Sequence, residues 1–267
     1  MEDVVSSSSE SSNSKLPSSA SPILAIETST TVARVAVIDA RTGARLAAAE
    51  AVAERHSSNL LRLCVETVEQ AGVSIAGLNA IACGAGPGSF TGLRVGLSVA
   101  KGLAMPMNIP LVLVSSLEAL AMDMLVAAQM GEFLLPCLDA GKGQIFAALF
   151  QRRADGSAAM LGDASATAGA TAGATAGATA GEWTVLPDLL PGHVADLLSG
   201  FAPDVEQDDA RIVCAGPGAV RYWDILAAGL GARGRFVEIA GPSADAVATR
   251  IVIVARDDTK RVGLRRQ

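Results

Sequence analysis

The chain has 267 residues, of which 50% are hydrophobic and 3% aromatic, and its formal net charge is −6. This apolar fraction suffices for a packed core and excludes global disorder, and the length allows one large domain or two compact ones. The chain has few aromatic side chains and a net negative charge, which argues against a protein that binds single-stranded nucleic acid by itself. Such proteins need stacking platforms and a basic groove.

Residues 1–21 are rich in serine and lack the apolar stretch of a targeting signal, so we expect a disordered tail. No run of about 18 uninterrupted apolar residues occurs, and no membrane span is expected. The four cysteines are far apart in the sequence and form no metal or redox motif, which favours the reducing cytoplasm. With only two histidines, a histidine-rich metal site is not expected.

The first half of the chain alternates apolar strands with amphipathic helices. Three strands form a meander, and Ser57 then caps a helix whose apolar positions repeat at helical spacing. A Gly-Pro-Gly turn at 86–88 leads from a buried strand into a second helix. In chain order, the expected strands are 23–26, 32–38, 45–52, 80–84 and 111–114, and the expected helices are 57–71, 90–104 and 116–130.

The second half repeats this order, with an acid after its first strand and a Gly-Pro-Gly turn before a helix. Glu27 and Gly86 are 59 residues apart, whereas Asp139 and Gly216 are 77 apart. The longer interval contains four Ala-Thr-Ala-Gly repeats at 166–181, and it shortens to 61 without these 16 residues. We therefore predict an internal duplication that carries a low-complexity surface insert. The expected strands are 134–139, 144–150, 183–186 and 212–214, and the expected helices are 194–199 and 219–230.

A strand meander followed by helix, strand and helix, present twice, indicates an α/β protein with the two-lobed actin-like ATPase fold, of the ASKHA or ribonuclease H-like type. Its duplicated βββαβα lobes would face each other across a cleft. We place the N-terminal lobe at 22–115 and the C-terminal lobe, with its insert, at 116–267. The alternative is an unrelated α/β protein, because strand–glycine–helix turns are common in that whole class.

The acids and the glycine turns would meet at the cleft between the lobes. Glycine turns at helix N-termini expose N–H groups that favour anions. Neither a P-loop nor a dinucleotide fingerprint occurs, however, so we expect no ATP hydrolysis by this chain. We predict a vestigial nucleotide cleft built from Glu27, Thr28, Ser29, Asp139, Gly216 and Gly218.

The sequence of residues 86–96, GPGSFTGLRVG, is more specific than this general layout. Together with ILAIETST at 23–30, it resembles the TsaB (YeaZ) family, and the resemblance covers residues 22–150 best. It implies a non-catalytic dimerisation or scaffold subunit of a cytoplasmic complex. That complex transfers threonylcarbamoyl to N6 of adenosine 37 in tRNAs that read codons beginning with A.

The same resemblance implies the partners and excludes a cofactor of the chain's own. The partners are a TsaD-type catalytic subunit or a second copy of this chain, a TsaE-type ATPase, and tRNA only through the complex, where ATP and magnesium would also act. The catalytic relatives bind a metal through two helical histidines, and the matching positions here are Ser116 and Leu120. Leucine has no donor atom, so we expect no metal site, no catalytic residue and no enzyme. The alternatives are an ATP-binding or kinase-like enzyme of the same fold and, with less support, a glycoprotease.

Small residues repeat every four positions along the helix at 90–104, which gives it one smooth face. This face either admits a partner helix or packs inside the chain, and both readings stay open at this point. The resemblance implies that this helix and the helix at 57–71 pair with the same helices of the catalytic subunit or of a second copy. The expected interface residues are Leu60, Leu61, Cys64, Gly88, Phe90, Gly92, Arg94, Gly96 and Ala100.

Overall fold

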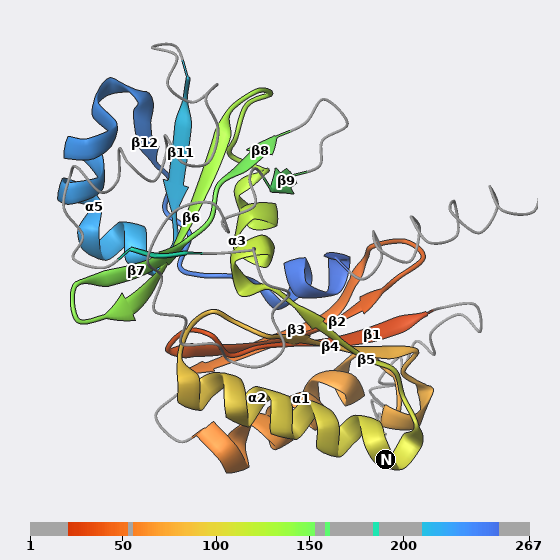
Figure 1. The fold of residues 1–267 in the computed structure, drawn as a ribbon. Helices are drawn as coiled ribbons and strands as arrows, with labels where there is room; N and C mark the ends of the chain where they lie inside the picture. Colours follow the sequence, from red (N-terminus) through yellow and green to blue (C-terminus); the bar gives the residue numbers. More distant parts are fainter. Residues whose placement is uncertain (1–20, 53–55, 153–157, 161–183, 187–209, 251–267) are drawn as a thin grey trace, which may run out of the picture.

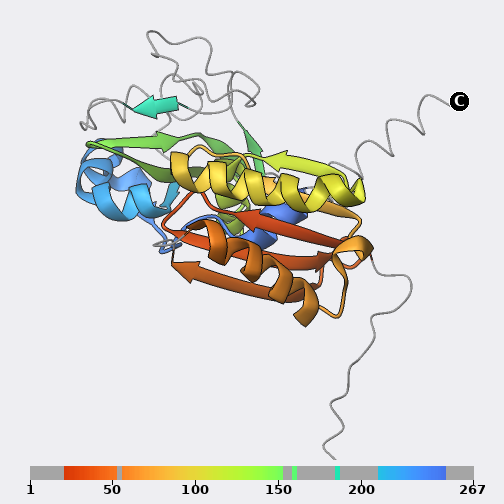
Figure 2. The same cartoon turned by 90° about the horizontal axis from the view of Figure 1, so that it is seen from below.

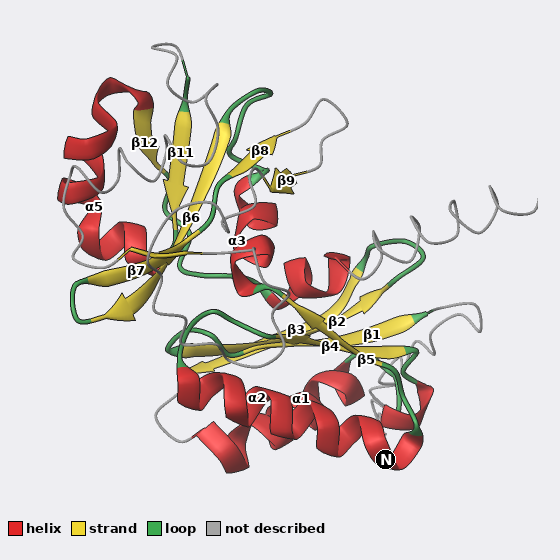
Figure 3. Cartoon of the chain, viewed as in Figure 1, coloured by secondary structure: helices red, strands yellow, loops and turns green. Residues whose placement is uncertain are grey.

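The computed structural model describes residues 21–52, 56–152, 158–160, 184–186 and 210–250. Within them the chain forms two β-sheets with helices packed on both (Figure 1, Figure 3). Residues 1–20 of the expected tail, the insert at 166–181 and the helix expected at 194–199 lie outside the described residues.

The first sheet has five strands in the order β3-β2-β1-β4-β5. The meander consists of β1 (Pro22–Glu27), β2 (Val32–Asp39) and β3 (Arg45–Val52), paired antiparallel. β4 (Ala80–Gly84) and β5 (Leu111–Val114) then join in parallel on the other side of β1. Both β1 and β4 are buried along their whole length, which explains why they read as continuous apolar runs in the sequence.

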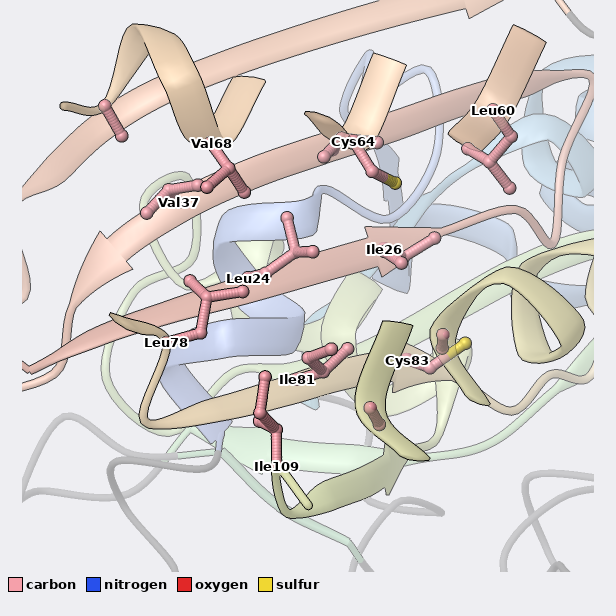
Figure 4. Close-up of a cluster of buried hydrophobic side chains, with 14 of the residues drawn as sticks. Leu24, Ile26, Val37, Leu60, Cys64, Val68, Leu78, Ile81, Cys83 and Ile109 are labelled. Atoms are coloured by element: carbon pink, nitrogen blue, oxygen red, sulfur yellow. The ribbon is translucent and has the colours of Figure 1, made fainter. Parts of the chain in front are cut away.

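Two helices cover one face of this sheet, α1 (His56–Gln70) and α2 (Phe90–Ala104) (Figure 2). Short 3-10 turns follow each of them, η2 (Ile75–Gly77) and η3 (Met105–Met107). Ser89 caps α2, because its side chain accepts a hydrogen bond from Gly92 N at 3.2 Å. The core between sheet and helices is aliphatic, and its labelled members in Figure 4 are Leu24, Ile26, Val37, Leu60, Cys64, Val68, Leu78, Ile81, Cys83 and Ile109.

The second sheet repeats the strand order of the first along its main path. β6 (Phe133–Gly141) is its central strand, and the path runs β10-β7-β6-β11-β12. β7 (Gln144–Ala147) and β10 (Thr184–Leu186) pair antiparallel, and β11 (Ile212–Ala215) and β12 (Gly234–Phe236) pair parallel. β8 (Phe150–Arg152) and β9 (Ala158–Met160) are additions to this pattern. The matching order and directions confirm the predicted duplication.

Three helical segments complete the packing around the two sheets. α5 (Pro217–Leu230), followed by the 3-10 turn η6 (Gly231–Arg233), covers one face of the second sheet. α3 (Ser116–Met124) lies between the sheets, since Ala119 faces the first sheet whereas Leu117 and Leu120 face the second. Residues 244–250 are helical and pack beside α3 on the face of the first sheet opposite α1 and α2 (Figure 1). This last segment was assigned by sequence to the C-terminal lobe, but its core contacts belong to the N-terminal one.

Two expected elements depart most from their expected bounds. The helix predicted at 116–130 ends at Met124, because carbonyl groups beyond it accept hydrogen bonds from arginines instead: Leu125 O from Arg152 at 2.9 Å and Ala127 O from Arg235 at 2.7 Å. The strand predicted at 144–150 is interrupted after Ala147 and resumes as β8, which pairs with the start of β6. Periodicity alone shows neither interruption.

Candidate functional site

The turn between β1 and β2 brings Glu27 inside the protein rather than to an open cleft. The Glu27 side chain is 0% exposed. Its carboxylate accepts hydrogen bonds from Ser29 N at 2.6 Å and from the Ser116 hydroxyl at 2.9 Å. Burial raises the pKa of Glu27, and the hydrogen bonds from Ser29 and Ser116 oppose that rise. The expectation that Glu27 lines a nucleotide cleft is therefore corrected: both oxygens are engaged within the chain.

Thr28 and Ser29 support α2 instead of lining the expected cleft. Both residues are buried, and Ser29 O accepts a hydrogen bond from Ser89 N, the residue before α2, at 2.7 Å. The Thr28 carbonyl and hydroxyl oxygens lie directly under the helix, against Gly92 and Gly96. This turn consequently packs against α2 and holds its N-terminus in place.

Asp139 belongs to a separate group of residues in the second lobe. Its carboxylate accepts hydrogen bonds from Gly141 N at 2.8 Å and from Arg221 of α5 at 2.7 Å. The glycine turn before α5 packs on the same strand, because a Cβ on Gly216 would lie 2.5 Å from Cys137 O and one on Gly218 would lie 3.0 Å from Cys137 C. The predicted cleft residues thus form two separate clusters, one around Glu27 beneath α2 and α3 and one around Asp139 beside α5.

The residues at the positions of the metal-binding histidines do not fit a metal. The Ser116 hydroxyl is committed to Glu27, and Leu120 is buried in the cluster between α3 and the second sheet. No group of three or more histidine, cysteine, aspartate or glutamate side chains among the described residues could hold a metal ion. The surroundings of Leu120 are apolar, and its side chain is 0% exposed.

The small-residue face of α2 packs inside the chain, so the reading of this face as a partner surface is corrected. A Cβ on Gly92 or Gly96 would overlap Thr28, and one on Gly88 would overlap Ser29. Ala100 lies in the same core as Leu60 and Cys64 of α1, and all three side chains are at most 3% exposed. These six residues, expected at the interface, therefore position α1 and α2 against their own lobe.

The remaining three expected interface residues are on the outer surface of the two helices. Leu61 of α1 is 46% exposed and Phe90 of α2 is 55% exposed. The Arg94 guanidinium carbon lies 3.7 Å from the centroid of the Phe90 ring, one helical turn away, in cation–π geometry. We call Leu61, Phe90 and Arg94 the outer face. Sequence reasoning missed Met105, which follows the last residue of α2 and is 77% exposed. The signal was the sequence Met-Pro-Met at 105–107, because these apolar residues stand where a helix ends and polar residues are expected.

The paired sheets and the helices between them define the class of protein. Each sheet consists of an antiparallel meander with two parallel strands added beside its first strand, which is the α/β actin-like arrangement predicted from the sequence. The structure of YeaZ from Pseudomonas aeruginosa superposes with a TM-score of 0.63 at 25% identity, covering 89% of this chain and 94% of that one. A second Pseudomonas aeruginosa structure, described as similar to peptidase YEAZ, also gives 0.63, at 26% identity and with coverage of 88% and 93%.

Sequence comparison leads to the same family. The protein TsaB of Escherichia coli strain K12, a tRNA threonylcarbamoyladenosine biosynthesis protein, is 34% identical over 134 residues, which are 50% of this chain and 57% of that one. TsaB of Haemophilus influenzae is 32% identical over 124 residues, 46% of this chain and 51% of that one. The family model TsaD, tRNA N6-adenosine threonylcarbamoyltransferase, matches residues 48–180. The chain spans about half the length of the curated relatives it matches, and the resemblance to the TsaB (YeaZ) family is confirmed.

One further expectation concerns membranes. Among the residues that the structure describes, none of the helices has both the length and the apolar composition to cross a bilayer.

Proposed function

We propose that the chain is a non-catalytic scaffold subunit in the synthesis of threonylcarbamoyladenosine in tRNA. Its catalytic partner would be a TsaD-type subunit, and a TsaE-type ATPase and tRNA would join through that complex. The similarity to proteins named for this biosynthesis supports the pathway. Support for a cytoplasmic location comes from the buried, unpaired thiols at Cys64, Cys83, Cys137 and Cys214.

The observation that carries the scaffold role is the outer face of α1 and α2. Phe90 and Arg94 stack on each other in solvent, and aromatic and arginine side chains are those that most often dominate binding energy at interfaces. The stacking also restricts both side chains before binding, which lowers the entropy lost on association. With the glycines holding α2 from below, this face is presented on a well-packed helix.

The non-catalytic role rests on the environment of Ser116 and Leu120. A metal site needs donor atoms that are free to coordinate. Here the Ser116 hydroxyl donates a hydrogen bond to Glu27, and the side chain of Leu120 is aliphatic. Chemistry would then be supplied by the partner, and ATP and magnesium would be bound there or by the ATPase. Among the contacts of the residues that the structure describes, none specifically favours a kinase or a glycoprotease.

The proposal is tested by titrating this chain with the TsaD-type subunit of the same cell. We expect Phe90→Ala and Arg94→Ala each to weaken binding by roughly tenfold, the effect of about 1.4 kcal/mol at an interface residue. Val126→Ala is the matched control, because Val126 is 94% exposed but follows α3, on the opposite side of the first sheet. Equal affinities for all variants would remove the outer face from the interface, whereas tight binding of magnesium ATP by the chain alone would favour the enzyme reading.

A further inference from the structure

The buried carboxylate of Glu27 has no part in the proposed docking, yet three structural elements converge on it. Ser29 N reaches it from the turn after β1, at 2.6 Å, and the Ser116 hydroxyl reaches it from the start of α3, at 2.9 Å. The third element is β4, whose Gly84 lies beside it. A fully enclosed carboxylate is costly unless it is hydrogen-bonded, and both donors are in place here.

Gly84 leaves the space that the carboxylate fills. A Cβ on Gly84 would overlap Oε2 of Glu27 and would lie 2.7 Å from its Cδ and 2.9 Å from its Oε1. All three nearest atoms belong to Glu27, so its carboxylate is the first group that a side chain at position 84 would meet. Glycine is otherwise unfavourable within a strand, because it loses more entropy on folding and has no side chain to pack.

We infer that Glu27 is a latch between the two lobes: its carboxylate ties the β1–β2 turn to the first residue of α3, and Gly84 makes room for it. The start of α3 is held at a second point, where Ser116 N donates to Gly86 O at 2.8 Å. Since α3 packs on both sheets, fixing its first turn fixes how the lobes meet. The turn on the other side of the latch supports α2 through Ser29 O and Ser89 N.

The ionisable group of the latch is the fully buried Glu27 carboxyl, so its contribution to the stability of the fold depends on pH. On β4 the neighbouring titratable group is Cys83, whose thiol pKa is raised to about 12 by burial and, to a smaller extent, by the charge of Glu27. Arg34 is the cross-strand partner of Glu27 on β2, but it forms an ion pair with Glu50 at 3.5 Å.

Charged groups on α3 are engaged elsewhere. Glu118 pairs with Arg250 at 2.5 Å, and Asp123 accepts hydrogen bonds from Ser243. No ion pair among the described residues involves Glu27, so hydrogen bonds from Ser29, Ser116 and the Thr28 backbone are what offset its burial.

The sign of the pH effect follows from the raised pKa of Glu27. A carboxyl group with a higher pKa in the folded protein stabilises the fold fully below its unfolded pKa, and that stability is lost as the pH rises through the folded pKa. Above pH 4.5, the ordinary value, the folding equilibrium constant of the wild type should therefore fall relative to Glu27→Gln, by up to tenfold per pH unit.

The first experiment compares urea unfolding of the full chain and of Glu27→Gln between pH 4 and pH 8 (about one measurement per half unit). Gln keeps the shape and hydrogen-bonding capacity of Glu but cannot ionise. Glu69→Gln, on the exposed surface of α1, controls for the change of net charge. The latch predicts that the two curves diverge as stated and that Ser116→Ala, which removes a hydrogen bond that lowers the pKa of Glu27, extends the divergence to higher pH. Parallel curves for the wild type and Glu27→Gln would overturn it.

The second experiment is a double-mutant cycle that tests the fit of Glu27 to Gly84 without reference to charge. We expect Gly84→Ala to reduce the folding equilibrium constant at least tenfold less in a Glu27→Ala background than in the wild type, because the methyl group then enters vacated space. Should Glu27→Ala not fold, Glu27→Asp, one methylene shorter, provides the second background. A cost of Gly84→Ala that is the same in both backgrounds would show that Gly84 does not serve Glu27 and would overturn the inference.

Discussion

At the scale of single residues, Gly96 decides which side of α2 is available to a partner. Its missing side chain makes room for the Thr28 hydroxyl, so Gly96→Leu should destabilise the fold itself, by about 1–3 kcal/mol, the usual cost of overpacking. Chemical unfolding of the variant measures this directly. Gly102→Ala on the same helix is the control: nothing lies within 4 Å of its Cβ position, and the change should stabilise the protein by roughly 0.5–1 kcal/mol. An unchanged unfolding midpoint for Gly96→Leu would contradict the inward packing.

The ion pair between Glu132 and Arg235 gives a second prediction at this scale. Burial alone would raise the pKa of Glu132, but the hydrogen bonds from Arg235 and from Gln129 N outweigh it and lower the pKa. Its contribution to stability is therefore present above the ordinary pKa of 4.5 and is lost as the pH falls through the lowered value. Arg235→Met should cost about 1–3 kcal/mol at pH 7, because it leaves a buried carboxylate underpaired. If acid unfolding of Arg235→Met has the same pH dependence as that of the wild type, the pair does not stabilise the fold.

The sequence singled out many of the residues that matter, but it did not predict what their side chains contact. The four-residue repeat of small side chains in α2 was evident in the sequence, but periodicity shows that residues share a face and not what covers it. The Thr28 oxygens that cover it are more than sixty positions away in the chain. Glu27 was found as an acid at a strand end, whereas its burial depends on Ser116, which no local pattern connects to it.

At the scale of elements, most strands and helices of the first lobe agree with the sequence prediction to within one residue. Buried strands and amphipathic helices bounded by glycine or serine give strong local signals there. The end of α3 was missed because it depends on arginines from β8 and β12, which are distant in sequence. The helical segment at 244–250 was missed because it spans only about two turns, too short for helical periodicity to stand out.

That segment is fastened to the rest of the molecule by its first turn. Ser243 N and its hydroxyl both donate to the Asp123 carboxylate at 2.7 Å, and the same hydroxyl accepts from Ala246 N at 3.0 Å. Arg45 of β3 bonds Asp245 at 2.9 Å. Ser243→Ala removes both the cap and a partner of Asp123, so we expect a loss of about 1–2 kcal/mol in unfolding free energy. Thr249→Ala, at the far end of the segment, should cost less, and equal costs would argue against capping as the cause.

At the scale of the whole molecule, the sequence predicted the duplication because the two halves share the order of acids, glycine turns and helices. The structure confirms it in the order and direction of the strands. The sequence did not predict that the matching acids of the two lobes have different surroundings. The first lobe buries its acid beneath α2 and α3, and the second pairs its acid with Arg221 near the surface. Both acids are therefore engaged in contacts within this chain.

We propose above that this chain supports threonylcarbamoyl transfer to tRNA through a partner and does not catalyse it. The most direct measurement is transfer to tRNA by the TsaD-type subunit and the TsaE-type ATPase of the same cell, with ATP, magnesium and the threonylcarbamoyl donor, in the presence and absence of this chain. We predict transfer only when the chain and the catalytic subunit are combined, and reduced transfer with folded Phe90→Ala. Transfer by this chain without the catalytic subunit, or full transfer by the other components without this chain, would contradict the scaffold role.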